Sequence, residues 1–156
     1  MVIAGTGAGG FANEWALSVS ARTVVKRIHN LDYHTLEGLR ALWSEYKVKY
    51  SILESFTTTV YQFGISEETG NIVTFAYRSS SNFTSEEIGY GTGVKPECDV
   101  LEGNLIELIP KMMEQQRSIQ GSFPESARIH IAGENIAFHL THSGCNTLII
   151  SEFDDF

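Results

Sequence analysis

The feature that most constrains the fold is a glycine-rich turn, residues 5–10, between an apolar run and the start of a helix. Val2, Ile3 and Ala4 precede the turn, and residues 14–17 after it are typical of a helix. Glycine lets the backbone reverse sharply and approach a neighbouring group. Amide groups at a helix N-terminus lack internal partners and attract negative charge. This strand–turn–helix unit therefore predicts a site for an anion or a developing oxyanion.

The composition is that of a globular protein. Hydrophobic residues make up 42% of the 156 residues and charged residues 19%, which excludes a disordered chain. This length is sufficient for one domain with its own core. We therefore expect a single domain over residues 1–156.

The charge distribution argues against several partners. The formal net charge is −8, and no basic run is present, so we expect neither nucleic acid nor an anionic membrane as a partner. No apolar stretch is long enough to span a bilayer, and no signal peptide is evident. Cys98 and Cys145 fit neither a disulfide framework nor a metal motif. These observations predict a cytoplasmic protein without a cofactor.

The first third of the chain is predicted to be helical. Residues 13–28 lack Gly and Pro and carry recurring apolar side chains, which favours a helix. Residues 30–33 are interpreted as a joint. Residues 34–50 have apolar side chains at steps of three and four, which predicts an amphipathic helix capped by Asp32 or Thr35.

The middle of the chain is predicted to form strands, because it is rich in β-branched and aromatic residues. Residues 56–65 and 72–77 are expected to pair as a hairpin around the turn 67–71. A second turn at residues 79–82 leads to a short strand within residues 83–90.

The last part of the chain is predicted to hold one helix and two strands. Residues 100–119 have helical periodicity, which Pro110 is expected to kink or break. Residues 129–138 and 139–150 are expected to form a hairpin around residues 142–146. The resulting order is β-α-α-β-β-β-α-β-β, which predicts an α+β fold with mainly antiparallel sheets.

One interpretation of the glycines is a dinucleotide site. Gly5, Gly7 and Gly10 match the G-x-G-x-x-G pattern that places a pyrophosphate on a helix N-terminus. That motif requires a parallel strand soon afterwards, ending in an acidic residue. Here a second helix follows instead, so this interpretation is the less favoured one.

Three stretches together resemble the proteasome β-subunit family and its bacterial two-ring relative, which are N-terminal-nucleophile hydrolases. Residues 2–13 are similar to the family's strand end and its A-G-G-x-A-D turn, with Asn13 in place of Asp. Residues 61–93 are similar to its central hairpin, with Gly91-Thr92-Gly93 in place of G-S-G. Residues 132–144 are similar to its late hairpin. The resemblance covers nearly the whole chain and implies an αββα four-layer sandwich.

The resemblance also implies a threonine-type amidohydrolase or peptidase chemistry. In this family an N-terminal Thr, Ser or Cys attacks an amide carbonyl, and the α-amine or a nearby Lys serves as the base. A backbone amide of the A-G-G turn binds the oxyanion. By resemblance that amide belongs to Gly9, and Thr92 takes the place of a serine that supports proton transfer near the amine. A peptide or amide is the implied substrate.

The family's nucleophile has no counterpart in the sequence, because Met1 has no ionisable proton on its side chain. The family's late Asp and Ser align with Arg128 and Ile131. The resemblance therefore predicts the fold without the first strands and without activity for the chain as given. Three explanations stay open: a truncated gene, a second chain that supplies the missing strands, or a non-catalytic scaffold. An uncovered sheet edge predicts self-association, as a homo-oligomer or ring.

The histidines and cysteines do not form an obvious site. His139 and His142 lie three apart on an expected strand, so they would point to opposite faces. A metal site needs three or more convergent ligands, and no metal is expected. Cys145 would be a nucleophile only if a histidine such as His142 lowered its pKa.

Overall fold

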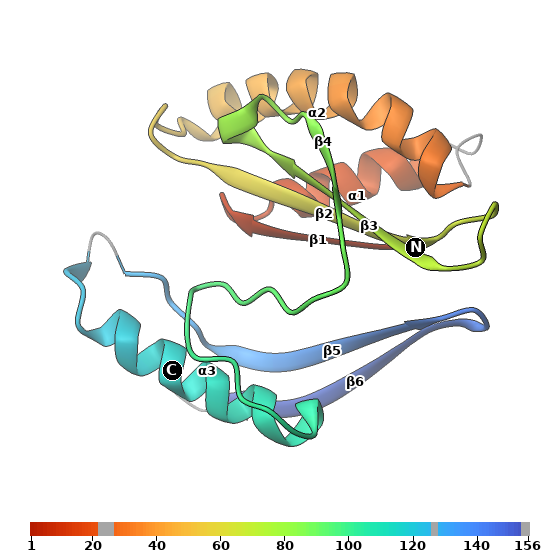
Figure 1. Ribbon diagram of the computed structural model, residues 1–156. Helices are drawn as coiled ribbons and strands as arrows, with labels where there is room; N and C mark the ends of the chain where they lie inside the picture. The colour runs from red at the N-terminus through yellow and green to blue at the C-terminus, as the bar shows by residue number, and fades with distance from the viewer. Residues whose placement is uncertain (22–26, 126–127, 154–156) are drawn as a thin grey trace. The chain divides into compact units, whose positions relative to one another are not determined.

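The computed structural model describes residues 1–21, 27–125 and 128–153 (Figure 1). They form two compact units, one of residues 1–89 with 140–145 and one of residues 90–139 with 146–156. No helix within the described ranges has the length and apolar character needed to cross a membrane. The expectation of a single domain stays a prediction.

The first unit contains a four-stranded sheet. Its strands are β1 (Val2–Gly7), β2 (Thr58–Ile65), β3 (Ile72–Arg78) and β4 (Ser85–Ile88), in the order β1-β2-β3-β4. All three pairings are antiparallel. The predicted hairpin and the predicted short strand are therefore confirmed, and β1 is an edge strand.

Two helices pack on one face of this sheet, as Figure 1 shows: α1 (Phe11–Ala21) and α2 (Ile28–Tyr50). Large aromatic and aliphatic side chains from both helices and from the sheet form the core. The ring of Phe11 makes edge contacts with Trp43 at 4.9 Å and Tyr46 at 5.3 Å between centroids. Such aromatic pairs contribute beyond their buried area. The most deeply buried hydrophobic residues are Phe11, Trp15, Leu31, Leu39, Val60, Ala76, Tyr77 and Phe83.

The predicted joint at residues 30–33 is wrong, because α2 begins at Ile28 and runs through it. Leu31 is only 2% exposed and lies on the buried side of the helix. Thr35 is not a cap; its hydroxyl donates to the Leu31 carbonyl at 2.7 Å. Asp32 is not a cap either, since its carboxylate accepts from the Tyr77 hydroxyl at 2.6 Å. These tertiary contacts outweigh the turn preference of the local sequence.

The preceding helix is confirmed over its described part. The expected helix over residues 13–28 corresponds to α1, which ends at Ala21. Residues 22–26 lie outside the described residues. The predicted helix from His34 to Tyr50 is confirmed as the greater part of α2.

The second unit contains α3 (Leu105–Gly121) and a two-stranded sheet of β5 (Gly133–Thr141) and β6 (Gly144–Phe153). The helix begins at 105 rather than 100, since the Asn104 side chain caps it by accepting from the Ile106 amide at 3.1 Å. Pro110 was expected to kink or break this helix; the break is wrong, because the helix continues through Pro110, and the kink stays a prediction.

The predicted final hairpin is confirmed, although its first strand starts later than expected. Residues 129–132 are irregular, and β5 starts only at Gly133, whose φ of 79° suits glycine. The element order matches the predicted order, and the described protein is a mixed α/β fold with antiparallel sheets.

Candidate functional site

The glycine turn joins β1 to α1 over residues 8–10. Gly7 and Gly10 adopt φ angles of 94° and 83°, a region that L side chains rarely occupy. A Cβ atom on Gly7 would lie 2.1 Å from the Thr57 carbonyl oxygen. A Cβ atom on Gly9, in contrast, would meet no atom within 4 Å. The turn thus requires glycine at Gly7 and Gly10, while Gly9 faces open space.

A cavity of about 220 Å³ lies over this turn. Its walls come from β1, from the turn, from the first turn of α1 and from the start of β2. The residues that line it are Ala4, Gly5, Thr6, Gly7, Ala8, Gly9, Gly10, Ala12, Asn13 and Thr58. No ionisable side chain is among them, so the cavity is polar chiefly through its backbone.

Two hydrogen bonds fix the direction of the turn's amides. The Ala8 carbonyl accepts from the Phe11 amide at 3.3 Å, and the Gly9 carbonyl accepts from the Tyr46 hydroxyl. In a trans peptide the C=O and the following N–H point in opposite directions. The Gly9 N–H therefore points away from Phe11, and the Gly10 N–H points away from Tyr46. Neither N–H donates to an acceptor in the described part of the chain.

Tyr46 supports the turn from α2. Its side chain is buried, and its ring stacks on Trp43 with 6.0 Å between centroids. Burial raises the pKa of Tyr46 above its ordinary value, with smaller contributions from Tyr50 and Glu14. Tyr46 thus stays a neutral donor at physiological pH and holds the Gly9–Gly10 peptide in place.

An ion pair joins the first turn of α1 to the last turn of α2. The Glu14 carboxylate accepts from the Lys49 ammonium and from the Tyr50 hydroxyl, each at 2.8 Å. The hydrogen bond from Lys49, followed by that from Tyr50, lowers the pKa of Glu14. Because Glu14 lies in the first turn of α1, this pair holds the start of α1 against α2.

The cavity also contains two hydroxyl groups, from Thr6 and Thr58. The Thr58 hydroxyl donates to the Thr6 carbonyl at 3.1 Å, and the Thr58 amide donates to Ser79 Oγ at 2.9 Å. Within the described ranges neither hydroxyl contacts a histidine, a lysine or a carboxylate. The arrangement can therefore stabilise a negative oxygen, but it holds no activated nucleophile.

The two predicted site residues belong to different units. Gly9 lines the cavity of the first unit. Thr92 is exposed on an irregular segment of the second unit. Gly5, Gly7 and Gly10 line the same cavity as Gly9.

The pairing of β1 argues against the dinucleotide interpretation. β1 pairs antiparallel with β2, and two helices lie between these strands in the sequence. A dinucleotide fingerprint needs a parallel β-α-β unit, which the described sheet of the first unit does not contain.

The other candidate residues lie in the last part of the chain. The expectation that His139 and His142 share a strand is wrong, because β5 ends at Thr141 and His142 lies in the turn. Cys145 is exposed at the start of β6. Arg128 donates to the carbonyls of Gly121 and Phe123. Over the described ranges, no group of three or more His, Cys, Asp or Glu side chains could hold a metal ion.

Tyr46 and Glu14 are the site residues that the sequence analysis missed. Tyr46 contributes to the apolar periodicity of its helix, and this periodicity hides the role of its hydroxyl. Its contact with Gly9 spans 37 residues, so no local pattern indicates it. Comparison of the chain with protein-family models, with curated proteins and with solved structures finds no match.

Proposed function

We propose that the chain is a proteasome-like N-terminal-nucleophile-hydrolase fold, an αββα sandwich, whose glycine turn binds the carbonyl oxygen of a peptide or amide. The observation that carries this proposal is the Gly9 amide. Gly9 lines the cavity, and its N–H points away from Phe11 and donates to no acceptor in the described part of the chain. Two helices on one face of an antiparallel sheet and an A-G-G turn between β1 and α1 support it. A cytoplasmic location is part of the same proposal.

The chemistry of this proposal is oxyanion stabilisation. When a nucleophile attacks an amide carbonyl, negative charge develops on the oxygen, and a preorganised N–H stabilises that charge. One such donor is worth about 3–4 kcal/mol in the transition state. Gly9 would be the principal donor, and Gly10 a second one. Thr92 would support proton transfer, and the nucleophile would be an N-terminal Thr, Ser or Cys, which the given sequence does not provide.

The test has two parts. First, the native protein is purified from its source, its intact mass and N-terminus are determined, and the preparation is assayed with fluorogenic peptide amides. We expect peptide hydrolysis together with a polypeptide that begins with Thr, Ser or Cys. A native protein that begins at Met1, with no second polypeptide and no hydrolysis, would contradict the catalytic proposal.

The second part tests the cavity itself by nuclear magnetic resonance. The ¹⁵N-labelled chain is titrated with an N-acetylated dipeptide amide, and the Gly9 and Gly10 amide signals are followed. We expect both to shift with saturation. The matched control is Gly9→Ala, which has room for its methyl group but narrows access to the amide. Equal shifts in this variant would count against binding at the turn.

A second candidate function is a self-assembling, non-catalytic subunit. The observation that favours it is the free edge of β1, a six-residue strand without a charged residue or proline. Such an edge is a template for pairing with another chain. This candidate predicts an oligomer that shows no hydrolysis.

A further inference from the structure

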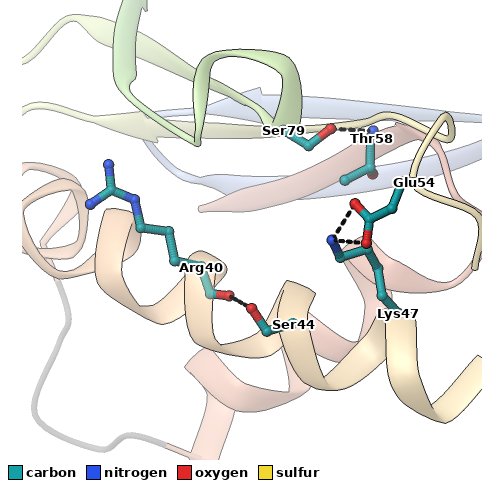
Figure 2. A network of polar contacts seen from close by, with 6 residues as sticks. All are labelled: Arg40, Ser44, Lys47, Glu54, Thr58 and Ser79. Carbon is teal, nitrogen blue, oxygen red and sulfur yellow. Dashed lines mark hydrogen bonds and ion pairs between the residues drawn. The ribbon is translucent and has the colours of Figure 1, made fainter.

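The first unit contains a second cavity, of about 360 Å³. Unlike the cavity over the glycine turn, it is lined by charged side chains. Figure 2 shows its polar groups: Arg40, Ser44 and Lys47 come from α2, Glu54 from the segment before β2, and Ser79 from the 3₁₀ turn η1 (Ser79–Ser81) after β3. All of these residues belong to one compact unit.

Among the residues that line this cavity the basic side chains outnumber the carboxylates, although Arg40 also pairs with Glu37, which is not part of the lining. Arg40 and Lys47 line it against the single carboxylate of Glu54, whereas the whole chain carries a formal net charge of −8. A local positive site on an acidic protein attracts anions selectively, because the surrounding surface repels them.

Glu54 occupies the position that an anion would take. Both of its carboxylate oxygens accept from the Lys47 ammonium, at 2.9 and 2.8 Å. The Glu54 side chain is 86% exposed, while that of Lys47 is only 24% exposed. An exposed ion pair contributes at most about 1 kcal/mol, so a ligand with more charge can displace the Glu54 carboxylate from Lys47.

Further donors face the same cavity. Ser79 Oγ accepts from the Thr58 amide at 2.9 Å, which leaves its hydroxyl hydrogen for another acceptor. The hydroxyl of Ser80 has no partner within the described residues. Arg40 donates through Nε to the Asn82 carbonyl and through Nη1 to Glu37, and its Nη2 hydrogens remain. These hydrogen-bond donors are more than one carboxylate group can use, and they suit the three oxygens of a phosphate.

The two residues that follow the serines of η1 have a strained backbone. Asn82 and Phe83 have φ angles of 52° and 57°, which is an outlier for a bulky residue such as Phe83. Burial of the Phe83 ring, which is 1% exposed, and a hydrogen bond from its amide to the Arg78 carbonyl at 2.8 Å stabilise this conformation. Strain of this kind persists where the surroundings over-determine it, often at ligand-binding sites.

We propose that this cavity binds a phosphate monoester. The phosphate lies on Lys47 and Arg40 and accepts from the hydroxyls of Ser79 and Ser80, while Glu54 moves aside. The apolar part of the ligand packs on Phe56, which lines the cavity and is 56% exposed. This site uses no residue of the glycine turn and does not depend on the function proposed for it.

The experiment is a titration of the full chain with phenyl phosphate. Binding is measured by calorimetry and by the nuclear magnetic resonance signals of the Ser79 and Ser80 amides. Inorganic phosphate and phenol serve as comparison probes. We expect phenyl phosphate to bind more tightly than inorganic phosphate, and phenol to show no saturation. Glu54→Gln removes the competing carboxylate and should raise the affinity up to about fivefold. Lys47→Met should lower it more than about tenfold.

Two control variants distinguish a specific binding site from a general electrostatic attraction of anions to the protein. Lys111→Met changes the net charge as Lys47→Met does, but Lys111 is an exposed residue of α3 in the second unit. Glu68→Gln is the corresponding control for Glu54→Gln. Both controls should bind as the unchanged chain does. Equal weakening by Lys47→Met and Lys111→Met would overturn the proposal.

The two cavity variants are expected to change the affinity for phenyl phosphate in opposite directions, so the test does not depend on the correct folding of one variant. If Lys47→Met fails to fold, as judged by circular dichroism, the Glu54→Gln variant decides. Absence of saturable binding in Glu54→Gln, or binding that leaves the Ser79 and Ser80 signals unchanged, would overturn the proposal.

Discussion

At the scale of single residues, Gly7 at the end of β1 and Gly9 in the turn tolerate a side chain differently. Gly7→Ala would place a methyl group 2.1 Å from the Thr57 carbonyl oxygen in a backbone with φ of 94°. We expect it to lower the free energy of unfolding by about 2–3 kcal/mol. Gly9→Ala, the matched control, meets no atom within 4 Å and should change it by less than about 0.5 kcal/mol. Urea unfolding of both variants checks the difference, and equal losses would contradict the described turn.

Tyr77 provides a second prediction at this scale, because its buried hydroxyl donates to Asp32 at 2.6 Å. Burial, followed by the hydrogen bond to Asp32, raises the pKa of Tyr77 well above its ordinary value. Tyr77→Phe leaves the Asp32 carboxylate without this donor, so we expect a loss of about 1–3 kcal/mol at pH 7. Tyr33→Phe, at a side chain that is 82% exposed, should be neutral.

The raised pKa of Tyr77 also predicts that the free energy of unfolding depends on pH. Unfolded tyrosine loses its proton near pH 10, whereas folded Tyr77 keeps it. The stability contributed by the protonated hydroxyl is therefore fully present below about pH 10 and is lost as the pH rises further. Urea unfolding between pH 8 and 11 should show this decline, and Tyr77→Phe should reduce its slope. Tyr46, whose pKa is also raised, should contribute part of the remaining slope.

At the scale of elements, the sequence predicted the order of the helices and strands better than their boundaries. The change from helical to alternating periodicity after Tyr50 identified α2 and the β2–β3 hairpin, because both signals lie within short windows. The joint at residues 30–33 was wrong because Asp32 is held by Tyr77, which lies 45 residues further on. The candidate site shows the same difference between local and distant signals. The turn that holds Gly9 was predicted from its glycines, but the contact with Tyr46 was not.

Helix α3 gives a prediction at the element scale, because it runs through Pro110. Proline has no N–H, so the Ile106 carbonyl one turn earlier lacks its helical partner. We expect Pro110→Ala to stabilise α3 by about 1–2 kcal/mol, since the restored bond outweighs the greater freedom of the unfolded chain. Hydrogen exchange of the α3 amides is the measurement. Lys111→Ala, the exposed neighbouring position, should leave exchange unchanged, and faster exchange in Pro110→Ala would contradict the expectation.

At the scale of the whole molecule, the free edge of β1 makes self-association the expected state. β1 pairs only with β2 within the described sheet, and its sequence carries no charge that would oppose a second strand. We expect light scattering at micromolar concentration to show an oligomer. Ala4→Lys places a charge on an exposed position of this strand and should shift the population towards the monomer.

The control for this prediction is Thr69→Lys, which adds the same charge at an exposed turn position between β2 and β3. It should leave the oligomer intact. If both variants dissociate it, general charge repulsion is the cause and β1 is not the interface. If the unchanged chain is a monomer at every concentration tested, then the edge of β1 does not cause self-association. The proposal of a self-assembling, non-catalytic subunit would then lose its support. An oligomer that only Ala4→Lys disrupts would place the interface directly beside the cavity of Gly9, since Ala4 lines that cavity, and assembly and carbonyl binding would then share one surface.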